Sequence, residues 1–270
     1  MVIEGRDSIM NKKLVSAILT GLFAVTMGFA AQQLKVQASS QYTVVKSSFP
    51  AGGTIYHAKS FTKNAYVWKH LNHKQKIANL KNYPNSSWYR TGIITLKHNG
   101  KKSVYYLVSN SSPLSKKTIT GFVWRGYLKK GYNPDFTKVK SISLGNATNS
   151  EYNQFIKHSK YQQLTRDILA LFPNSTVSKP LSRYALFREP KDKVVTDVAT
   201  FKAMDDFLNV KNRLTNQQRL AKIKAILAAN GYTAANRQRE YIIGIYLTNF
   251  QWSDQYDTGD MHQGFVIGTK

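Results

Sequence analysis

The sequence contains no cysteine, and residues 39–134 contain no aspartate or glutamate. The absence of cysteine excludes disulfide bonds, cysteine-ligated zinc and every thiol nucleophile, so the cysteine peptidases are excluded. For an exported protein it is also more typical of a Gram-positive bacterium than of a eukaryote. The absence of carboxylates excludes a general acid–base pair and a carboxylate metal ligand from 39–134. The first half of the chain therefore favours binding over catalysis.

What residues 39–134 do contain is sixteen lysines and arginines together with fifteen aromatic residues. This stretch carries +16 of the chain's formal net charge of +25, whereas residues 135–270 carry only +7. Because an ordinary solvated surface mixes both signs of charge, cations and rings alone predict a polyanionic partner with flat or sugar-like faces.

The N-terminus has the pattern of an export signal. Two lysines at 12–13 precede an apolar run over 14–31, and a small-x-small pattern ends at Ala38. We predict that residues 1–38 are removed, with Ala30 as a second candidate site. The alternative is an uncleaved membrane anchor, for which this run of about eighteen residues is near the lower limit.

The 270 residues are enough for two domains, and 42% of them are hydrophobic, which is enough for a core. We predict a small all-β domain over 40–133, a linker over 134–148 and an α+β domain over 149–270. Turn signals separate the expected strands of the first domain, and Asn99-Gly100 predicts a hairpin. The expected strands are 42–45, 54–56, 65–68, 87–89, 92–96, 102–108 and 120–124.

In the second domain, capping boxes at Thr148-x-x-Glu151 and Thr215-x-x-Gln218 predict the starts of two helices. The first helix is expected to run to about Phe172, and the second to end at Gly231. The pattern further predicts a short helix capped by residue 196 or 197, and strands at 139–144, 182–187, 241–250 and 264–268.

The segment Gly121–Leu128 resembles the closing strand and turn of bacterial SH3-like domains, and Tyr105–Val108 resembles the strand before it. The resemblance covers roughly residues 54–130. It implies a small β-barrel that tethers a secreted protein to the cell wall, and the general composition is similar to surface proteins of lactic acid bacteria. The Asn-Val-Arg-Ser-Gly signature of the family is absent, with only Asn72-His73-Lys74 in its place. Binding residues are therefore not carried over from the family.

Candidate ligand contacts come instead from strand alternation and from basic clusters at turns. Trp68 and Trp124 lie on strands, whereas Trp88-Tyr89-Arg90 follows a loop, so a ring there is expected to be exposed. The candidate set is Trp68, Trp88, Tyr89, Arg90, Lys101, Lys102, Trp124, Arg125, Lys129 and Lys130.

No catalytic residue, metal or cofactor is predicted. The second half offers only His158 and His262, without HExxH spacing, and the acidic residues near 254–260 do not match a calcium loop. The alternative of an enzyme depends on carboxylates that converge in space. Those carboxylates would be Glu151, Glu189 and Glu240.

The sequence thus favours a secreted, non-enzymatic surface protein that binds the anionic bacterial cell wall, either teichoic acid or peptidoglycan. A cell-wall hydrolase with an unrecognised catalytic domain in 149–270 is the first alternative. A nucleic-acid-binding protein is the second, because net charge alone permits it, although export argues against nucleic acid as a partner. No stable membrane span is expected after signal cleavage.

Export generates a direct prediction. N-terminal sequencing of protein recovered from culture supernatant or wall extract is expected to begin at Ser39, immediately after the small-x-small pattern. Full-length protein retained in the cytoplasm would contradict it.

Overall fold

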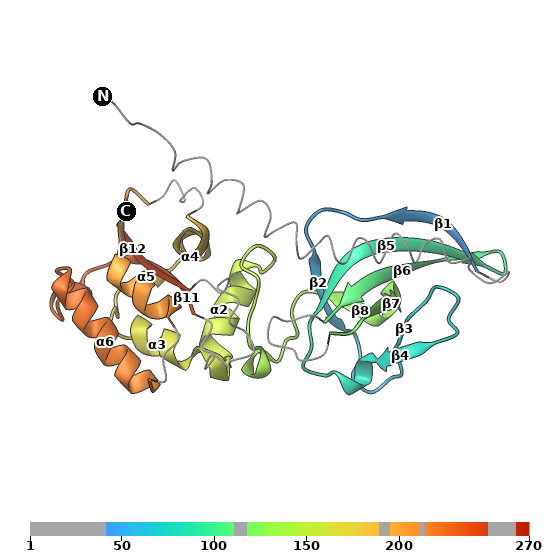
Figure 1. Cartoon of the computed structure of the whole chain (residues 1–270), viewed down its shortest axis with the longest axis horizontal. Coiled ribbons are helices and arrows are strands. Elements are labelled where there is room, and N and C mark those ends of the chain that lie inside the picture. The colour runs from blue at the N-terminus through green and yellow to red at the C-terminus, as the bar shows by residue number, and fades with distance from the viewer. Residues whose placement is uncertain (1–41, 111–117, 189–194, 211–213, 248–262, 270) are drawn as a thin grey trace, which may run out of the picture.

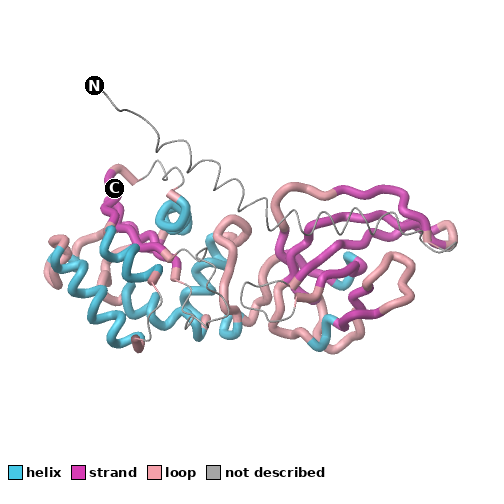
Figure 2. The backbone as a smooth tube through the Cα atoms, in the orientation of Figure 1, coloured by secondary structure: helices cyan, strands magenta, loops and turns pink. Residues whose placement is uncertain are grey.

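A computed structural model of the chain describes residues 42–110, 118–188, 195–210, 214–247 and 263–269. A large curled antiparallel sheet makes up the first half, and a smaller sheet with helices makes up the second (Figures 1 and 2). The fold is therefore mixed α+β. The predicted export signal, residues 1–38, lies outside the described residues. Within the described ranges, no helix is long and apolar enough to cross a membrane.

Eight strands form the large sheet, in the order β4-β3-β7-β6-β5-β2-β8, and β1 also pairs with β5. The sheet curls into a half-barrel, and β4 and β8 end this order without pairing with each other in the described residues. The finer expectation of an SH3-like barrel stays a prediction. Strands β4 and β8 were not predicted, and the expected strands 87–89 and 92–96 are one continuous strand, β5. The bounds are β1 (Thr43–Ser48), β2 (Thr54–Ala58), β3 (Tyr66–Trp68), β4 (Lys76–Asn79), β5 (Trp88–His98), β6 (Lys101–Ser109), β7 (Thr120–Trp124) and β8 (Leu128–Lys130).

The predicted hairpin joins the two longest strands of this sheet, β5 and β6. Asn99 and Gly100 have φ values of 48° and 74°, so both central residues are left-handed, as a type I′ turn requires. His98 then pairs with Lys101, and the antiparallel register continues to Gly92 opposite Leu107, beyond which a β-bulge shifts it before Arg90 pairs with Val108. The turn thereby fixes which side chains of the two strands share a face.

Both faces of the large sheet carry buried apolar side chains. One face holds a core that includes Val67, Leu80, Trp88, Val108 and Val123. The opposite face holds a second cluster, formed by Leu71, Ile94, Leu96, Leu107 and Phe122. Phe122 and Val123 are neighbours on β7 and point to opposite faces, because side chains alternate along a strand.

The second half contains a four-stranded sheet with the order β10-β12-β11-β9. Strands β11 and β12 pair antiparallel, with Ile242 opposite Gly268, and they confirm that strands form within the expected segments 241–250 and 264–268. The bounds are β9 (Thr176–Val177), β10 (Asp197–Thr200), β11 (Ile242–Tyr246), β12 (Gly264–Thr269), α2 (Asn149–His158), α3 (Gln163–Leu169), α4 (Lys179–Phe187), α5 (Lys202–Asn209) and α6 (Asn216–Ala229).

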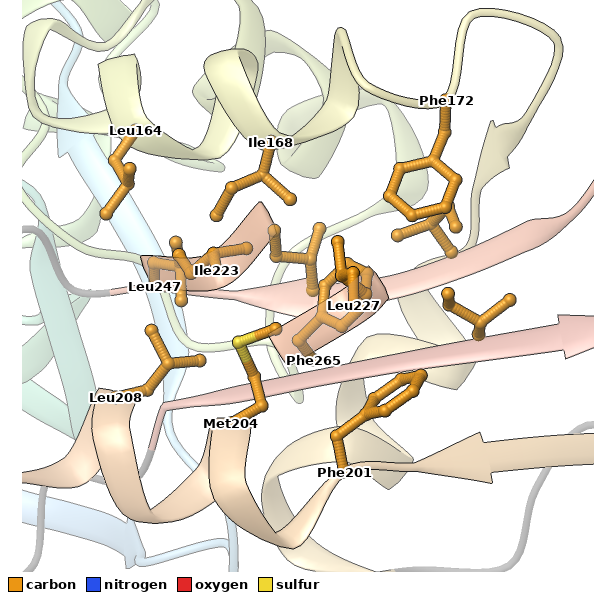
Figure 3. Close-up of a cluster of buried hydrophobic side chains, with 13 residues drawn as sticks. Leu164, Ile168, Phe172, Phe201, Met204, Leu208, Ile223, Leu227, Leu247 and Phe265 are labelled. Carbon is orange, nitrogen blue, oxygen red and sulfur yellow. The ribbon is translucent and has the colours of Figure 1, made fainter. Parts of the chain in front are cut away.

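Helices cover both faces of this smaller sheet. Apolar side chains from α3, α5 and α6 pack on one face, where Ile168, Met204 and Leu227 surround Phe265 (Figure 3). Helix α4 lies on the other face, against glycines. A Cβ at Gly244 would lie 2.5 Å from the Leu181 carbonyl oxygen, so only glycine allows so close an approach.

Both predicted capping boxes are present, but several other helix and strand predictions are wrong. Residues 182–187 belong to helix α4, because Ser178 caps it and Pro180 is tolerated in its first turn. Residues 197–200 form a strand paired with β12 and do not cap a helix. The helix that starts after Thr148 ends early, because Ser159 leaves the helical conformation and its hydroxyl donates to the Val139 carbonyl oxygen at 2.6 Å.

The segment predicted as a linker, 134–148, is packed and not extended. Its apolar side chains Phe136, Val139, Ile142 and Leu144 are buried, and the expected strand at 139–144 does not form. They pack with Tyr152 and Phe155 of α2 and with Ile55 of the large sheet. This shared cluster links the two halves through apolar contact.

A single carboxylate reinforces that link. Glu151 accepts hydrogen bonds from the Tyr132 backbone N–H at 2.8 Å, from the Thr148 N–H at 2.8 Å and from the Thr148 hydroxyl at 3.0 Å. It therefore caps α2 and also holds the chain where it leaves the large sheet.

Glu151→Ala is expected to lower the free energy of unfolding by about 2 kcal/mol, because it removes a cap and leaves backbone donors unpaired. Urea denaturation followed by circular dichroism measures the change. Glu240→Ala, which removes an exposed carboxylate of the same type, is the matched control and is expected to be neutral. Equal stability of the two variants would contradict the role given to Glu151.

Candidate binding face

Seven aromatic rings gather on one face of the large sheet, and we call them the ring row. They lie beside the apolar cluster of Leu71, Ile94, Leu96, Leu107 and Phe122. His98 stacks on Tyr42 with ring centroids 4.1 Å apart, and Tyr42 is 4.5 Å from His73. His73 in turn lies 4.8 Å from Trp68 and 4.9 Å from Tyr105. The ring row consists of Tyr42, Trp68, His73, His98, Tyr105, Trp124 and Tyr127.

Strand register carries the ring row across the sheet. Tyr105 on β6 is directly opposite Trp124 on β7, so their side chains share a face. Trp124 then meets Tyr127 edge to face, with centroids 5.0 Å apart and planes at 85°. Trp124 and Tyr127 are 41% and 37% exposed, so this end of the ring row is accessible to a ligand.

His73 occupies the middle of the ring row in an unusual backbone conformation, with a φ of 57°. Its Nε2 atom is buried and has no hydrogen-bond partner. Burial and then the neighbouring His98 lower the pKa of His73 to about 4, because both disfavour the imidazolium form. At neutral pH the ring is therefore uncharged and packs as an aromatic.

Cations flank the ring row along its length. Lys76 Nζ lies 4.1 Å from the ring centroid of Tyr66, which is a neighbour of Trp68. Lys101 is paired with His98 at one end, and exposed Arg125 adjoins Trp124 at the other. Every ion pair between described residues lies beyond residue 134. The positive charge of the large sheet is thus uncompensated by the described carboxylates.

The structure separates the predicted contact residues. Trp88 is 0% exposed and packs inside the core against Tyr83, so the expectation of an exposed ring there is wrong. Tyr89 packs against the cluster that links the two halves, and burial raises its pKa. Arg90 lies on the face opposite the ring row, where it donates to the Thr54 hydroxyl at 2.8 Å.

The remaining candidates divide by position. Trp68, Lys101, Trp124 and Arg125 belong to the ring row or its margin. Lys102 is exposed but points to the opposite face, since it alternates with Lys101. Lys129 and Lys130 are exposed on β8, the edge strand that follows Tyr127.

Sequence reasoning missed five members of the ring row. Two of them, His98 and Tyr105, could have been predicted from the hairpin. Pairing His98 with Lys101 places His98 and Tyr105 on the same face of the sheet. Tyr42 depends on the pairing of β1 with β5, and His73 lies in a turn between β3 and β4, so neither follows from a local pattern. Tyr127 depends on the 3-10 turn over Arg125–Tyr127.

The described residues contain no group of three His, Cys, Asp or Glu that could hold a metal ion. Of the three carboxylates considered for hydrolysis, Glu151 is engaged in the contacts described above and Glu240 is exposed. Glu189, His262 and the acidic stretch 254–260 lie outside the described residues.

Comparison of the chain with family models, with curated proteins and with solved structures found no match. The geometry and charge of the ring row are therefore what indicate the function of this chain.

The lowered pKa of His73 makes a prediction about stability. The unfolded chain has a histidine pKa near 6.5, so between about pH 6.5 and pH 4 it binds more protons than the folded chain. The part of the stability that depends on neutral His73 is therefore present above pH 6.5 and is lost as the pH falls toward 4.

Thermal melts at pH 7.5, 6, 5 and 4.5 check this for the wild type and for His73→Asn, since asparagine tolerates the left-handed backbone. Wild type is expected to lose more melting temperature than the variant on acidification. Because the ring is half exposed, the difference is moderated by solvent. Parallel pH profiles would contradict the assignment.

Proposed function

We propose that this chain is a secreted cell-surface protein that binds an anionic polymer of the bacterial wall, teichoic acid or peptidoglycan, through the ring row and its flanking cations. The observation that carries the proposal is the combination of seven neighbouring rings with lysine and arginine side chains that have no described carboxylate partner.

Charge supports a polyanionic ligand. Exposed cations repel one another when no carboxylate separates them, and a polymer of phosphates or carboxylates relieves that repulsion on binding. Lys101 and Arg125 lie beside the two ends of the ring row, and Lys76 lies beside its middle. An extended polymer that follows the rings would therefore meet a positive charge at intervals.

The rings support a ligand with apolar faces as well as charge. Aromatic side chains offer a large contact area at a low cost in conformational entropy, and half-exposed rings on a sheet are already ordered before binding. A ligand with phosphate groups but no apolar face would need only the lysine side chains for binding.

Several finer points belong to the same proposal. The resemblance to bacterial SH3-like domains, on which wall tethering was expected, depends on the segment that forms β7, the 3-10 turn and β8. The division into a binding domain and an α+β domain of separate role, and the secreted localisation, are part of the same proposal. Catalysis by the second half is an outcome to be tested by zymography.

The source of affinity is tested on the mature chain with purified cell walls. Raising the salt from 0.1 M to 1 M shortens the screening length from roughly 10 Å to about 3 Å, so wall binding is expected to fall steeply. Replacing Lys76, Lys101 and Arg125 by Gln is expected to weaken binding about tenfold at 0.1 M salt. Each exposed contact contributes a fraction of a kcal/mol, and the three together approach the roughly 1.4 kcal/mol that corresponds to a tenfold change in affinity.

The matched control replaces Lys157, Lys224 and Arg239 by Gln, which removes the same charge from exposed positions of the second half. Equal loss in both triple variants would show that net charge, and not the ring row, attracts the polymer. Competition of wall binding by teichoic acid and by DNA separates the two anions, and stronger competition by DNA would contradict the proposal.

A further inference from the structure

The accessible end of the ring row has a specific architecture. Trp124 ends β7, and its indole folds back onto Gly126, two residues later in the 3-10 turn. A Cβ built on Gly126 would lie 2.3 Å from two carbon atoms of the six-membered indole ring, Cη2 and Cζ3. Gly126 therefore leaves the space that the ring occupies.

Three neighbours hold the indole in place. Gly126 supports it from the backbone, Tyr127 meets it edge to face at 5.0 Å, and Tyr105 lies opposite it on the next strand. The side chain is nevertheless 41% exposed. A large aromatic that is both fixed and exposed resembles a binding hot spot before its partner arrives, because little freedom remains to be lost.

We infer that the Trp124–Gly126–Tyr127 corner is a stacking subsite for a pyranose ring, and that the occupant is a glycan strand of peptidoglycan. This inference rests on the proposed function and narrows it. The C–H groups on one face of a pyranose carry slight positive charge and meet the negative face of an aromatic ring. A polyglycerol phosphate backbone has no such face and would use only the cations.

Charge next to the corner fits the same occupant. Arg125 is exposed between Trp124 and Gly126 in the sequence, and Lys129 and Lys130 are exposed just after Tyr127. The lactyl carboxyl of the peptidoglycan sugar is amide-linked to the stem peptide, so the carboxylates that would meet these cations are those of the peptide that the stacked glycan strand carries. Stacking then selects the ring and charge selects the acid.

The experiment uses the full mature chain and two probes, peptidoglycan sacculi freed of teichoic acid and soluble polyglycerol phosphate. Gly126→Ala is the sharpest variant, because Gly126 has no left-handed φ and the three atoms nearest to its added methyl group all belong to the Trp124 indole. It shifts the ring without changing any charge. Trp124→Ala removes the ring, and Gly145→Ala, where a Cβ has no contact closer than 3.8 Å, is the matched control.

Gly126→Ala and Trp124→Ala are each expected to weaken binding to sacculi about tenfold, the effect of losing one aromatic stack. Binding of both to polyglycerol phosphate, and the binding of Gly145→Ala to both probes, are expected to stay within about twofold of wild type. Circular dichroism confirms that each variant is folded.

The outcomes separate the inference from the proposed function. Sacculus binding that both ring variants retain, while the triple cation variant loses it, would overturn the stacking subsite and leave the wall-binding proposal in place. An equal loss for both probes would show that the corner supports the fold and would also overturn the inference. A wild-type chain that binds neither polymer would overturn the proposed function itself.

Discussion

The type I′ turn at Asn99-Gly100 is the local constraint on which the large sheet depends. Strand β5 pairs with β1, β2 and β6, so its register determines what every neighbouring strand presents. A slip of β6 by one residue against β5 would turn the side chains of β6 over, because strand side chains alternate with period two. Tyr105 would then face the core and Tyr106 would face the side of the ring row. The buried core on one face and the ring row on the other are consequences of the same pairing.

The uneven distribution of charge has a structural counterpart. The large sheet has no carboxylate of its own, and the carboxylate that links it to the second half is Glu151, which is engaged in backbone hydrogen bonds and not in an ion pair with a lysine. The cations near the ring row therefore stay available to a ligand. His73 does not add to the positive charge of this face at neutral pH, because its lowered pKa keeps the imidazole uncharged among the other rings of the ring row.

Local signals predicted much of the architecture. The hairpin turn, both capping boxes and most strands of the large sheet were found because each depends on residues close in sequence. Residues 182–187 were mistaken for a strand, since their apolar content is equally compatible with the helix that Ser178 caps. Segment 134–148 was expected to be a linker with one strand at 139–144, and its spaced apolar residues are buried between the halves without forming that strand. Burial without secondary structure leaves no periodic pattern to detect.

The sequence by itself determined the excess of cations and rings, the absence of thiol chemistry and of carboxylates in the first half, and the positions of the main turns and caps. Only the tertiary structure decided which rings meet. Tyr42, His73 and Trp124 are far apart in sequence, and they gather because β1, the turn after β3 and β7 are brought to one face by pairing and packing. The same packing buried Trp88 and exposed Trp124. Side-chain exposure in a curled sheet depends on what covers each face, and that information is not local to any strand.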